Sequence, residues 1–223
     1  MSWRDVLAGL PRMFVGLVLV LTGQGGANAG IAPCASVAVA AQVGVEVGAG
    51  RPAAGWSPAS NTRRFWVNDK HRYFSDWYAG KHRKMVPFGC TRAPYYDPDP
   101  RCAHQRGVHH GLDVAMPCRT RLYAGYRSRV VDPDAPGALG AAYGPHAFRL
   151  RSSSLGKDFV IGHVRRVFVD RGDRVRRGEL IALASDAGAP DGCHLHFEVR
   201  PLGGSYTSAI APYDDIRLRR RKP

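Results

Sequence analysis

Histidines and carboxylates near the C-terminus have a spacing that suits metal binding and proton transfer. Residues 191–200 read DGCHLHFEVR. Side chains two residues apart on a strand share a face, so this run places His194, His196 and Glu198 together on one side. The apolar residues between them face a core on the other side; they are Leu195, Phe197 and Val199. Three ionisable groups on one face indicate a chemical role.

A second group lies upstream, where residues 109–117 read HHGLDVAMP. On a strand, His109 and Asp113 share a face and His110 points away. Four extended residues span about 13 Å, which is too far for both side chains to hold one ion. Gly111 permits the bulge or kink that closes this gap. The spacing therefore suits chelation if the strand bends at the glycine.

The two groups together match the donors of a catalytic zinc site. Such a site takes three protein ligands from His, Asp or Glu and leaves one position open. His109, Asp113 and one histidine of the HLH pair would provide them, and the other histidine would move protons. His163, in VIGHVRRV, either joins this site or is an ordinary core histidine.

The elements that position these residues are predicted to be strands. From residue 85 onward, short apolar runs alternate with Gly, Pro and Asp turns, which is typical of an all-β domain. We place that domain at 85–213, with a hairpin or long loop at 137–158. Residues 214–223 form a basic tail, which is usually a solvated end.

The N-terminal third has a different texture. Residues 30–61 are rich in Ala, Val and Gly and indicate a disordered lead or linker. Residues 62–84 are aromatic and basic. They form either a helix or hairpin packed beside the main domain, or a separate binding patch.

Residues 1–29 have the organisation of a secretory signal peptide. A weakly basic start precedes an 11-residue apolar run, MFVGLVLVLTG, and small residues follow. The run is shorter than the roughly 20 residues of a membrane span, although an uncleaved anchor is the alternative. We expect a secreted or envelope-associated protein with no membrane span after cleavage.

Charge and cysteine content fit an exported protein. The formal net charge is +14, which favours anionic partners. Export disfavours nucleic acid among them and favours anionic wall polymers. The five cysteines allow at most two disulfides, and we expect Cys90–Cys102 and Cys118–Cys193, with Cys34 left over.

Three motifs in order resemble the lysostaphin and LytM type of zinc metallopeptidase. They are HHGLD, then GHVRRVFVDRGDRVRRGELIALAS, then GCHLHFEVRP. The middle one contains the pattern V-x-x-G-D-x-V-x-x-G at Val169, Gly172, Asp173, Val175 and Gly178. The opening PFGCTR at 87–92 also resembles this family, and the likeness covers roughly residues 85–202.

The resemblance implies roles for the candidate residues. One zinc per chain would be bound by His109, Asp113 and His196, with His163 and His194 as catalytic histidines around the attacked carbonyl. It also implies a compact antiparallel β-sheet domain with a groove over the sheet. Family members hydrolyse peptide bonds in peptidoglycan stem peptides or cross-bridges.

Two other functions compete with this interpretation. Some relatives have lost metal ligands, so an inactive wall-binding or regulatory member is the alternative; all five expected positions are filled here. A biotinyl or lipoyl carrier would need a modifiable lysine at a hairpin tip. No lysine occurs from 158 to 221, which argues against a carrier.

Overall fold

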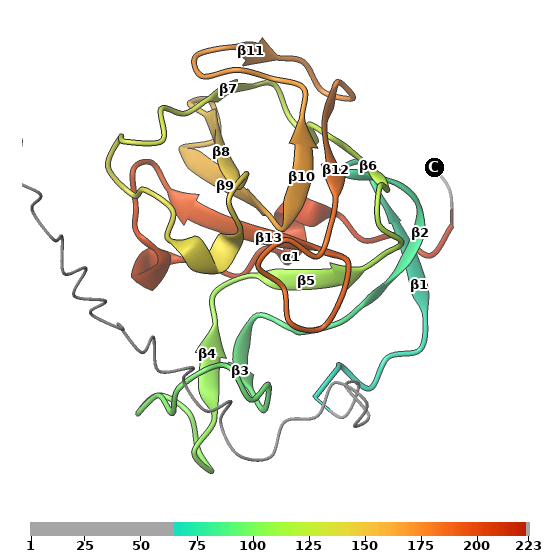
Figure 1. Cartoon of the computed structure of the whole chain (residues 1–223), viewed down its shortest axis with the longest axis vertical. Helices are drawn as coiled ribbons and strands as arrows, with labels where there is room; N and C mark the ends of the chain where they lie inside the picture. The colour runs from blue at the N-terminus through green and yellow to red at the C-terminus, as the bar shows by residue number, and fades with distance from the viewer. Residues whose placement is uncertain (1–64, 222–223) are drawn as a thin grey trace, which may run out of the picture. The chain divides into compact units, whose positions relative to one another are not determined.

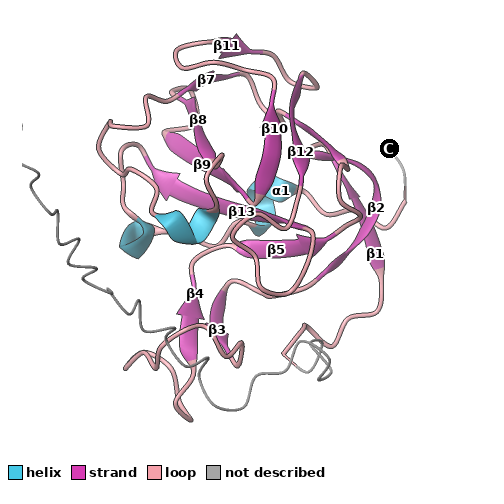
Figure 2. Ribbon diagram, in the orientation of Figure 1, coloured by secondary structure: helices cyan, strands magenta, loops and turns pink. Residues whose placement is uncertain are grey.

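The computed structural model describes residues 65–221. The expected signal peptide and linker, together with Cys34, lie outside these residues. The described part is nearly all β (Figures 1 and 2), which confirms the predicted fold class. None of its helices has the length and hydropathy of a membrane span.

The strands form one large sheet and one small one. In chain order they are β1 (Arg72–Ser75), β2 (Tyr78–Lys84), β3 (Gly89–Thr91), β4 (Gly107–His109), β5 (Leu112–Ala115), β6 (Arg121–Tyr123), β7 (Ser128–Val130), β8 (Phe148–Ser152), β9 (Lys157–Gly162), β10 (Val164–Val167), β11 (Arg174–Val175), β12 (Leu180–Ala184) and β13 (His194–Pro201). The helical turns are η1 (Ala141–Tyr143), η2 (Tyr206–Ser208) and α1 (Tyr213–Ile216).

All neighbouring strands run antiparallel. The large sheet has the order β10-β12-β6-β2-β5-β13-β9-β8-β7-β11, with β1 added beside β2, and β3 pairs with β4 separately. The predicted hairpin or loop at 137–158 is a loop containing η1, followed by β8 and the turn into β9. This order places β13 between β5 and β9, at the centre of the sheet.

The apolar face of the sheet forms the main core. Leu195, Phe197 and Val199 of β13 are fully buried there, as the alternation of the HLHFEV run predicts. Trp77 packs beside Phe197, with ring centroids 4.6 Å apart. Burying each such side chain contributes about 1.5–3 kcal/mol, so β13 is firmly held through its apolar face.

The segment expected as an N-terminal extension contributes to this same sheet. β1 and β2 both lie within residues 62–84, and β2 is hydrogen-bonded to β5 and β6. Trp77, in the turn between β1 and β2, donates its indole N–H to the carbonyl of Asp215 at 2.9 Å. Segments near the beginning and the end of the described chain therefore contact each other.

Two disulfides are present, Cys90–Cys102 and Cys118–Cys193, with the pairing predicted from the sequence. The first closes the loop between β3 and β4. The second joins the segment after β5 to the residue immediately before β13. Both therefore fix chain segments that lead into the strands carrying the candidate ligands.

Candidate metal centre

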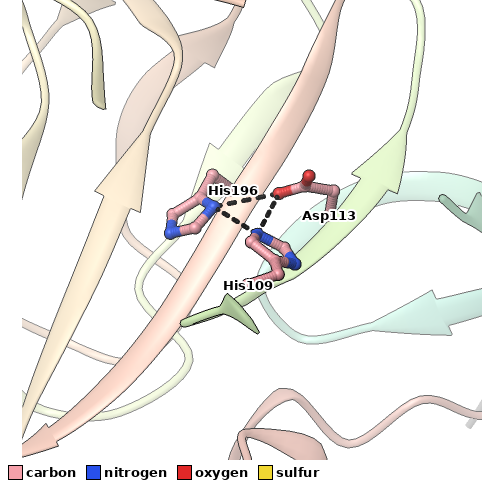
Figure 3. Close-up of side chains that lie close together, drawn as sticks. All are labelled: His109, Asp113 and His196. Carbon is pink, nitrogen blue, oxygen red and sulfur yellow. Dashed lines mark hydrogen bonds and ion pairs between the residues drawn. The ribbon is translucent and has the colours of Figure 1, made fainter. Parts of the chain in front are cut away.

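Two segments far apart in the sequence bring the predicted ligands together. β13 pairs with β5 in a register that sets His196 directly opposite Asp113. His109 is the last residue of β4 and enters the same cluster from the other side of a bend (Figure 3). All three side chains are buried.

The donor atoms of these side chains converge on one point. His196 Nδ1 lies 2.9 Å from Asp113 Oδ1 and 3.1 Å from His109 Nε2, and the last two atoms are 3.3 Å apart. Ligand atoms at the corners of a zinc tetrahedron are separated by about 3.3 Å. The three donors therefore already have the spacing of one face of such a tetrahedron.

The bend expected at Gly111 is present, because β4 ends at His109 and β5 begins at Leu112. Close contact also excludes a side chain at this position. A Cβ on Gly111 would lie 2.6 Å from His196 Cε1 and 2.8 Å from the carbonyl oxygen of Phe197. Glycine is thus required because the bend passes directly against the ring of His196.

Hydrogen bonds on the far side of each ring orient the two histidines. His109 Nδ1 donates to the carbonyl of Pro87 at 2.9 Å, which leaves Nε2 facing the cluster. His196 uses its nitrogens in the opposite sense. Its Nε2 donates to Glu198 Oε2 at 3.3 Å, which leaves Nδ1 for the cluster. Partners of this kind fix the tautomer and orientation of metal-binding histidines.

The electrostatics of the cluster favour a cation. Burial opposes ionisation of Asp113, but the neighbouring His109 and His194 and the hydrogen bonds from His109 and His196 hold its pKa well below the usual value. Burial also opposes a charge on His196, yet its hydrogen bonds with Asp113 and Glu198 raise its pKa to about 9. A site that retains a proton so strongly, and whose donors are two imidazoles and a carboxylate, fits zinc.

The two remaining candidate histidines lie beside this cluster. His194 Nε2 is 3.6 Å from Asp113 Oδ1, and within the described chain it has no hydrogen-bond partner despite being buried. The ring of His163 lies against that of His194, with centroids 4.4 Å apart. The structure thus brings all five predicted site residues into one cluster.

His163 occupies a strained backbone position between β9 and β10. Its φ of 54° is in the left-handed region, which costs a non-glycine residue about 1–3 kcal/mol. Its N–H donates to the carbonyl of Tyr143 at 2.8 Å, and its carbonyl accepts from Ser185 N–H at 2.7 Å and from the Ser185 hydroxyl at 3.1 Å. These bonds keep the ring turned toward His194.

Backbone carbonyls also set the tautomers of this second pair. His194 Nδ1 lies 2.8 Å from the Gly192 carbonyl, and His163 Nδ1 lies 2.9 Å from the Ala187 carbonyl. Both therefore carry their proton on Nδ1 when neutral, so Nε2 is the proton-accepting atom. Burial, together with the charges of His194 and His196, lowers the pKa of His163 to about 3, so this ring is neutral at pH 7.

A network behind His196 was not predicted in full from the sequence. The Tyr143 hydroxyl donates to Glu198 Oε2 at 2.9 Å and accepts from Arg200 Nη2 at 2.8 Å. Arg200 also contacts the other oxygen of Glu198 through Nε. Arg200 follows the ligand-bearing alternation of β13, but Tyr143 comes from an irregular loop with no periodic signal. His146, in the same loop, is exposed and outside the cluster.

An open cavity adjoins the metal cluster. It has a volume of about 420 Å³, and it is lined by Tyr96, His109, His110, Ala138, Gly140, Ala142, Tyr143, His163, His196 and Tyr206. His110 thus points into this cavity and does not join the ligand group, in agreement with the strand alternation. The arrangement can hold a substrate segment beside a metal and two proton-accepting imidazoles.

Comparison with known proteins finds a matching sequence family and solved structures of similar fold. Residues 107–209 match the sequence model of peptidase family M23. LytU shares the fold, at 24% identity and a TM-score of 0.50, over 66% of this chain and 92% of that one. The catalytic domain of lysostaphin from Staphylococcus simulans has 22% identity over 61% of this chain and 92% of its own, with a TM-score of 0.47. A zinc-containing peptidase from Vibrio cholerae has 24% identity over 63% of this chain and 39% of its own, with a TM-score of 0.46. The matched segment, residues 107–209, contains all five candidate site residues, so the part of the chain that carries the site is similar to peptidase family M23.

Proposed function

We propose that this protein is an exported, zinc-dependent endopeptidase that hydrolyses peptide bonds in peptidoglycan stem peptides or cross-bridges. The observation that carries this proposal is the convergence of His109, Asp113 and His196, with the buried and unpartnered Nε2 of His194 beside them. The match of residues 107–209 to a peptidase family supports the reaction type. The resemblance of the three sequence motifs to the lysostaphin and LytM type supports peptidoglycan as the substrate.

The residues divide the work of peptide hydrolysis. When bound, zinc supplies an acidified water molecule and polarises the peptide carbonyl. His194 Nε2 accepts a proton from the attacking water, because its Nδ1–H is engaged with a backbone carbonyl. His163 Nε2 likewise begins as an acceptor. It stabilises an oxyanion or protonates the leaving amine only after the proton that His194 took from the water has reached it, and the centroids of the two rings lie 4.4 Å apart.

The alternative is an inactive wall-binding or regulatory member of the same family. Such a protein would have no use for an unpartnered buried nitrogen next to the ligand cluster, or for the strained backbone that holds His163. Both features cost stability and both suit turnover. The active enzyme is therefore the better proposal.

A direct test is to incubate the purified protein with defined muropeptides and to weigh the products. Each cut is expected to add one water and to separate two peptides. Removal of the metal with a chelator should abolish the cuts, and added zinc should restore them. Zinc-loaded protein that leaves all muropeptides intact would support the inactive alternative.

We further propose that a row of arginines holds the protein to anionic wall polymers. Arg174 of β11 pairs directly with Arg129 of β7, which pairs directly with Arg151 of β8. Arg151 forms an ion pair with Asp158, but Arg129 and Arg174 have no such partner within the described residues. Like charges opposite each other on a sheet are destabilising, so an anion bound between Arg129 and Arg174 would relieve their repulsion. The row borders a hollow of about 690 Å³ that Arg127 and Arg176 also line. Guanidinium groups bind phosphate in a bidentate manner.

The row can be tested by cosedimentation of the protein with purified cell wall. Changing Arg129 and Arg174 to Gln should weaken binding several-fold at low salt and reduce its dependence on salt concentration. The matched control changes the exposed Arg121 and Arg165 to Gln, which removes the same charge elsewhere. Equal binding by the two double variants would show that general charge, and not this row, holds the wall.

A further inference from the structure

Asp191 is a buried carboxylate that the proposed mechanism does not use. It lies in the loop between β12 and β13, and its side chain is only 1% exposed. Oδ2 accepts a hydrogen bond from the Tyr95 hydroxyl at 2.9 Å. Oδ1 has no hydrogen-bond partner within residues 65–221. One oxygen of a buried acid is therefore left unsatisfied.

No arginine or lysine of the described chain forms an ion pair with Asp191. The other deeply buried carboxylates outside the metal cluster each have such a partner; they are Asp158, Asp215 and Glu198. For Asp191 the nearest chargeable nitrogen is His194 Nδ1, at 3.7 Å, and that atom is already bonded to a carbonyl. Burial raises the pKa of Asp191, as expected for a carboxylate that lacks a cation.

Asp191 lines a small cavity next to the catalytic histidines. The cavity has a volume of about 180 Å³ and also borders the proposed ligand Asp113; its other walls include Tyr95, Tyr96, His163 and His194. No lysine or arginine is among the residues that line it, although the protein as a whole is strongly basic. Aromatic faces next to a carboxylate suit a cationic group on an apolar stem.

We propose that Asp191 anchors a subsite for a primary ammonium group of the substrate, adjacent to the attacked peptide bond. This inference rests on the proposed peptidase function and narrows its substrates to peptides with a free amine close to the cut. The ammonium group donates to Asp191 Oδ1 and satisfies the oxygen that the protein leaves unpartnered. Such charge-assisted hydrogen bonds are about twice as strong as neutral ones.

The test compares one muropeptide digest before and after its amines are capped with acetic anhydride. The digest is divided into two halves, of which only one is capped. Zinc-loaded full-length protein should cleave the uncapped half with a kcat/KM at least about tenfold higher than that for the capped half. Asp191→Asn, which is isosteric, should keep its zinc and cleave both halves equally. The product masses show whether the recognised amine is on a side chain or at a chain end.

A matched control is Asp186→Asn, which removes the same charge from an exposed position in the same loop and should keep the preference. Equal cleavage of both halves by the unmodified protein would overturn the subsite. So would an Asp191→Asn variant that still prefers free amines.

A binding experiment separates this inference from the proposed function. NMR titration of the zinc-loaded protein with n-butylammonium should give saturable shifts that n-butanol does not produce, and Asp191→Asn should weaken them at least about fivefold. Such binding without any hydrolysis would leave the subsite standing and reject the peptidase. If the protein hydrolyses muropeptides but neither prefers free amines nor binds n-butylammonium, the subsite is rejected and the peptidase function is retained.

Discussion

At the scale of single residues, two histidines of one strand face the same side yet differ in what they can do. His196 has a carboxylate behind its Nε2 and presents Nδ1 to the ligand cluster. His194 has a backbone carbonyl at Nδ1 and leaves Nε2 unpartnered beside Asp113. Under the proposed function, the partner of the second nitrogen, and not the position on the strand, thus separates the zinc ligand His196 from the proton acceptor His194.

This difference predicts that His194→Ala keeps its zinc and loses turnover. Loss of a general base lowers turnover by about 10²- to 10⁴-fold, while the three ligands remain intact. The check is metal content measured alongside muropeptide hydrolysis in one preparation. The exposed His146→Ala is the control and should match the unmodified protein. Turnover within a few-fold of normal in His194→Ala would remove His194 from catalysis.

At the scale of elements, the pairing of β5 with β13 and the bend before β5 build the ligand cluster. The register sets Asp113 opposite His196, and the bend at Gly111 turns His109 toward both. The apolar side chains of β5 and β13 are buried in the core. The opposite face of the two strands, which carries the candidate ligands, is therefore held in a fixed position. Small changes at the bend should therefore reach the metal.

Gly111→Ala is predicted to lower both stability and zinc content. The added Cβ would meet the His196 ring and the carbonyl of Phe197, and such overpacking costs about 1–3 kcal/mol. Thermal unfolding and metal analysis measure the two effects. Gly140→Ala is the stability control, because a Cβ there meets nothing within 4 Å. A Gly111→Ala protein with normal stability and zinc would contradict the close approach.

The sequence predicts local features of these elements better than their partners. The alternation of the HLHFEV run correctly gives the buried face of β13, and the spacing of His109 and Asp113 requires the bend at Gly111. The pairing of β13 with β5 joins residues 83 positions apart. The donor types indicated that both segments could share one metal, but nothing in the sequence showed that the two strands are neighbours. Tyr143 and Asp191 come from irregular loops, where no periodicity links a residue to its place.

At the scale of the whole molecule, contacts between distant segments hold the described chain together. Trp77 contacts Asp215 near the C-terminus, and two disulfides fix loops next to the ligand-bearing strands. β1 and β2, from the segment that composition set apart as an extension, belong to the sheet through the pairing of β2 with β5 and β6, and Trp77 between them is part of the main core. Aromatic and basic composition alone does not distinguish a surface patch from a strand with one buried face. The signal peptide and export stay predictions, since residues 1–64 lie outside the described part.

Arginines and carboxylates gather at different places in the described part of the molecule. The arginine row on β7, β8 and β11 lies at the opposite end of the sheet domain from β3 and β4 (Figure 1), whereas the cavity beside His194 contains carboxylates and no lysine or arginine. The proposed binding of an anionic wall by the arginine row and the proposed binding of an amine beside Asp191 are compatible, because the two sites occupy different places.

Zinc stoichiometry of the full-length protein tests the central claim most directly. The unmodified protein should bind one zinc per chain, and His109→Ala and His196→Ala should each lose it, together with all muropeptide hydrolysis. Both losses follow because each variant leaves only two of the three converging donors. Full zinc occupancy in either variant would contradict the account, since the metal would then be held elsewhere.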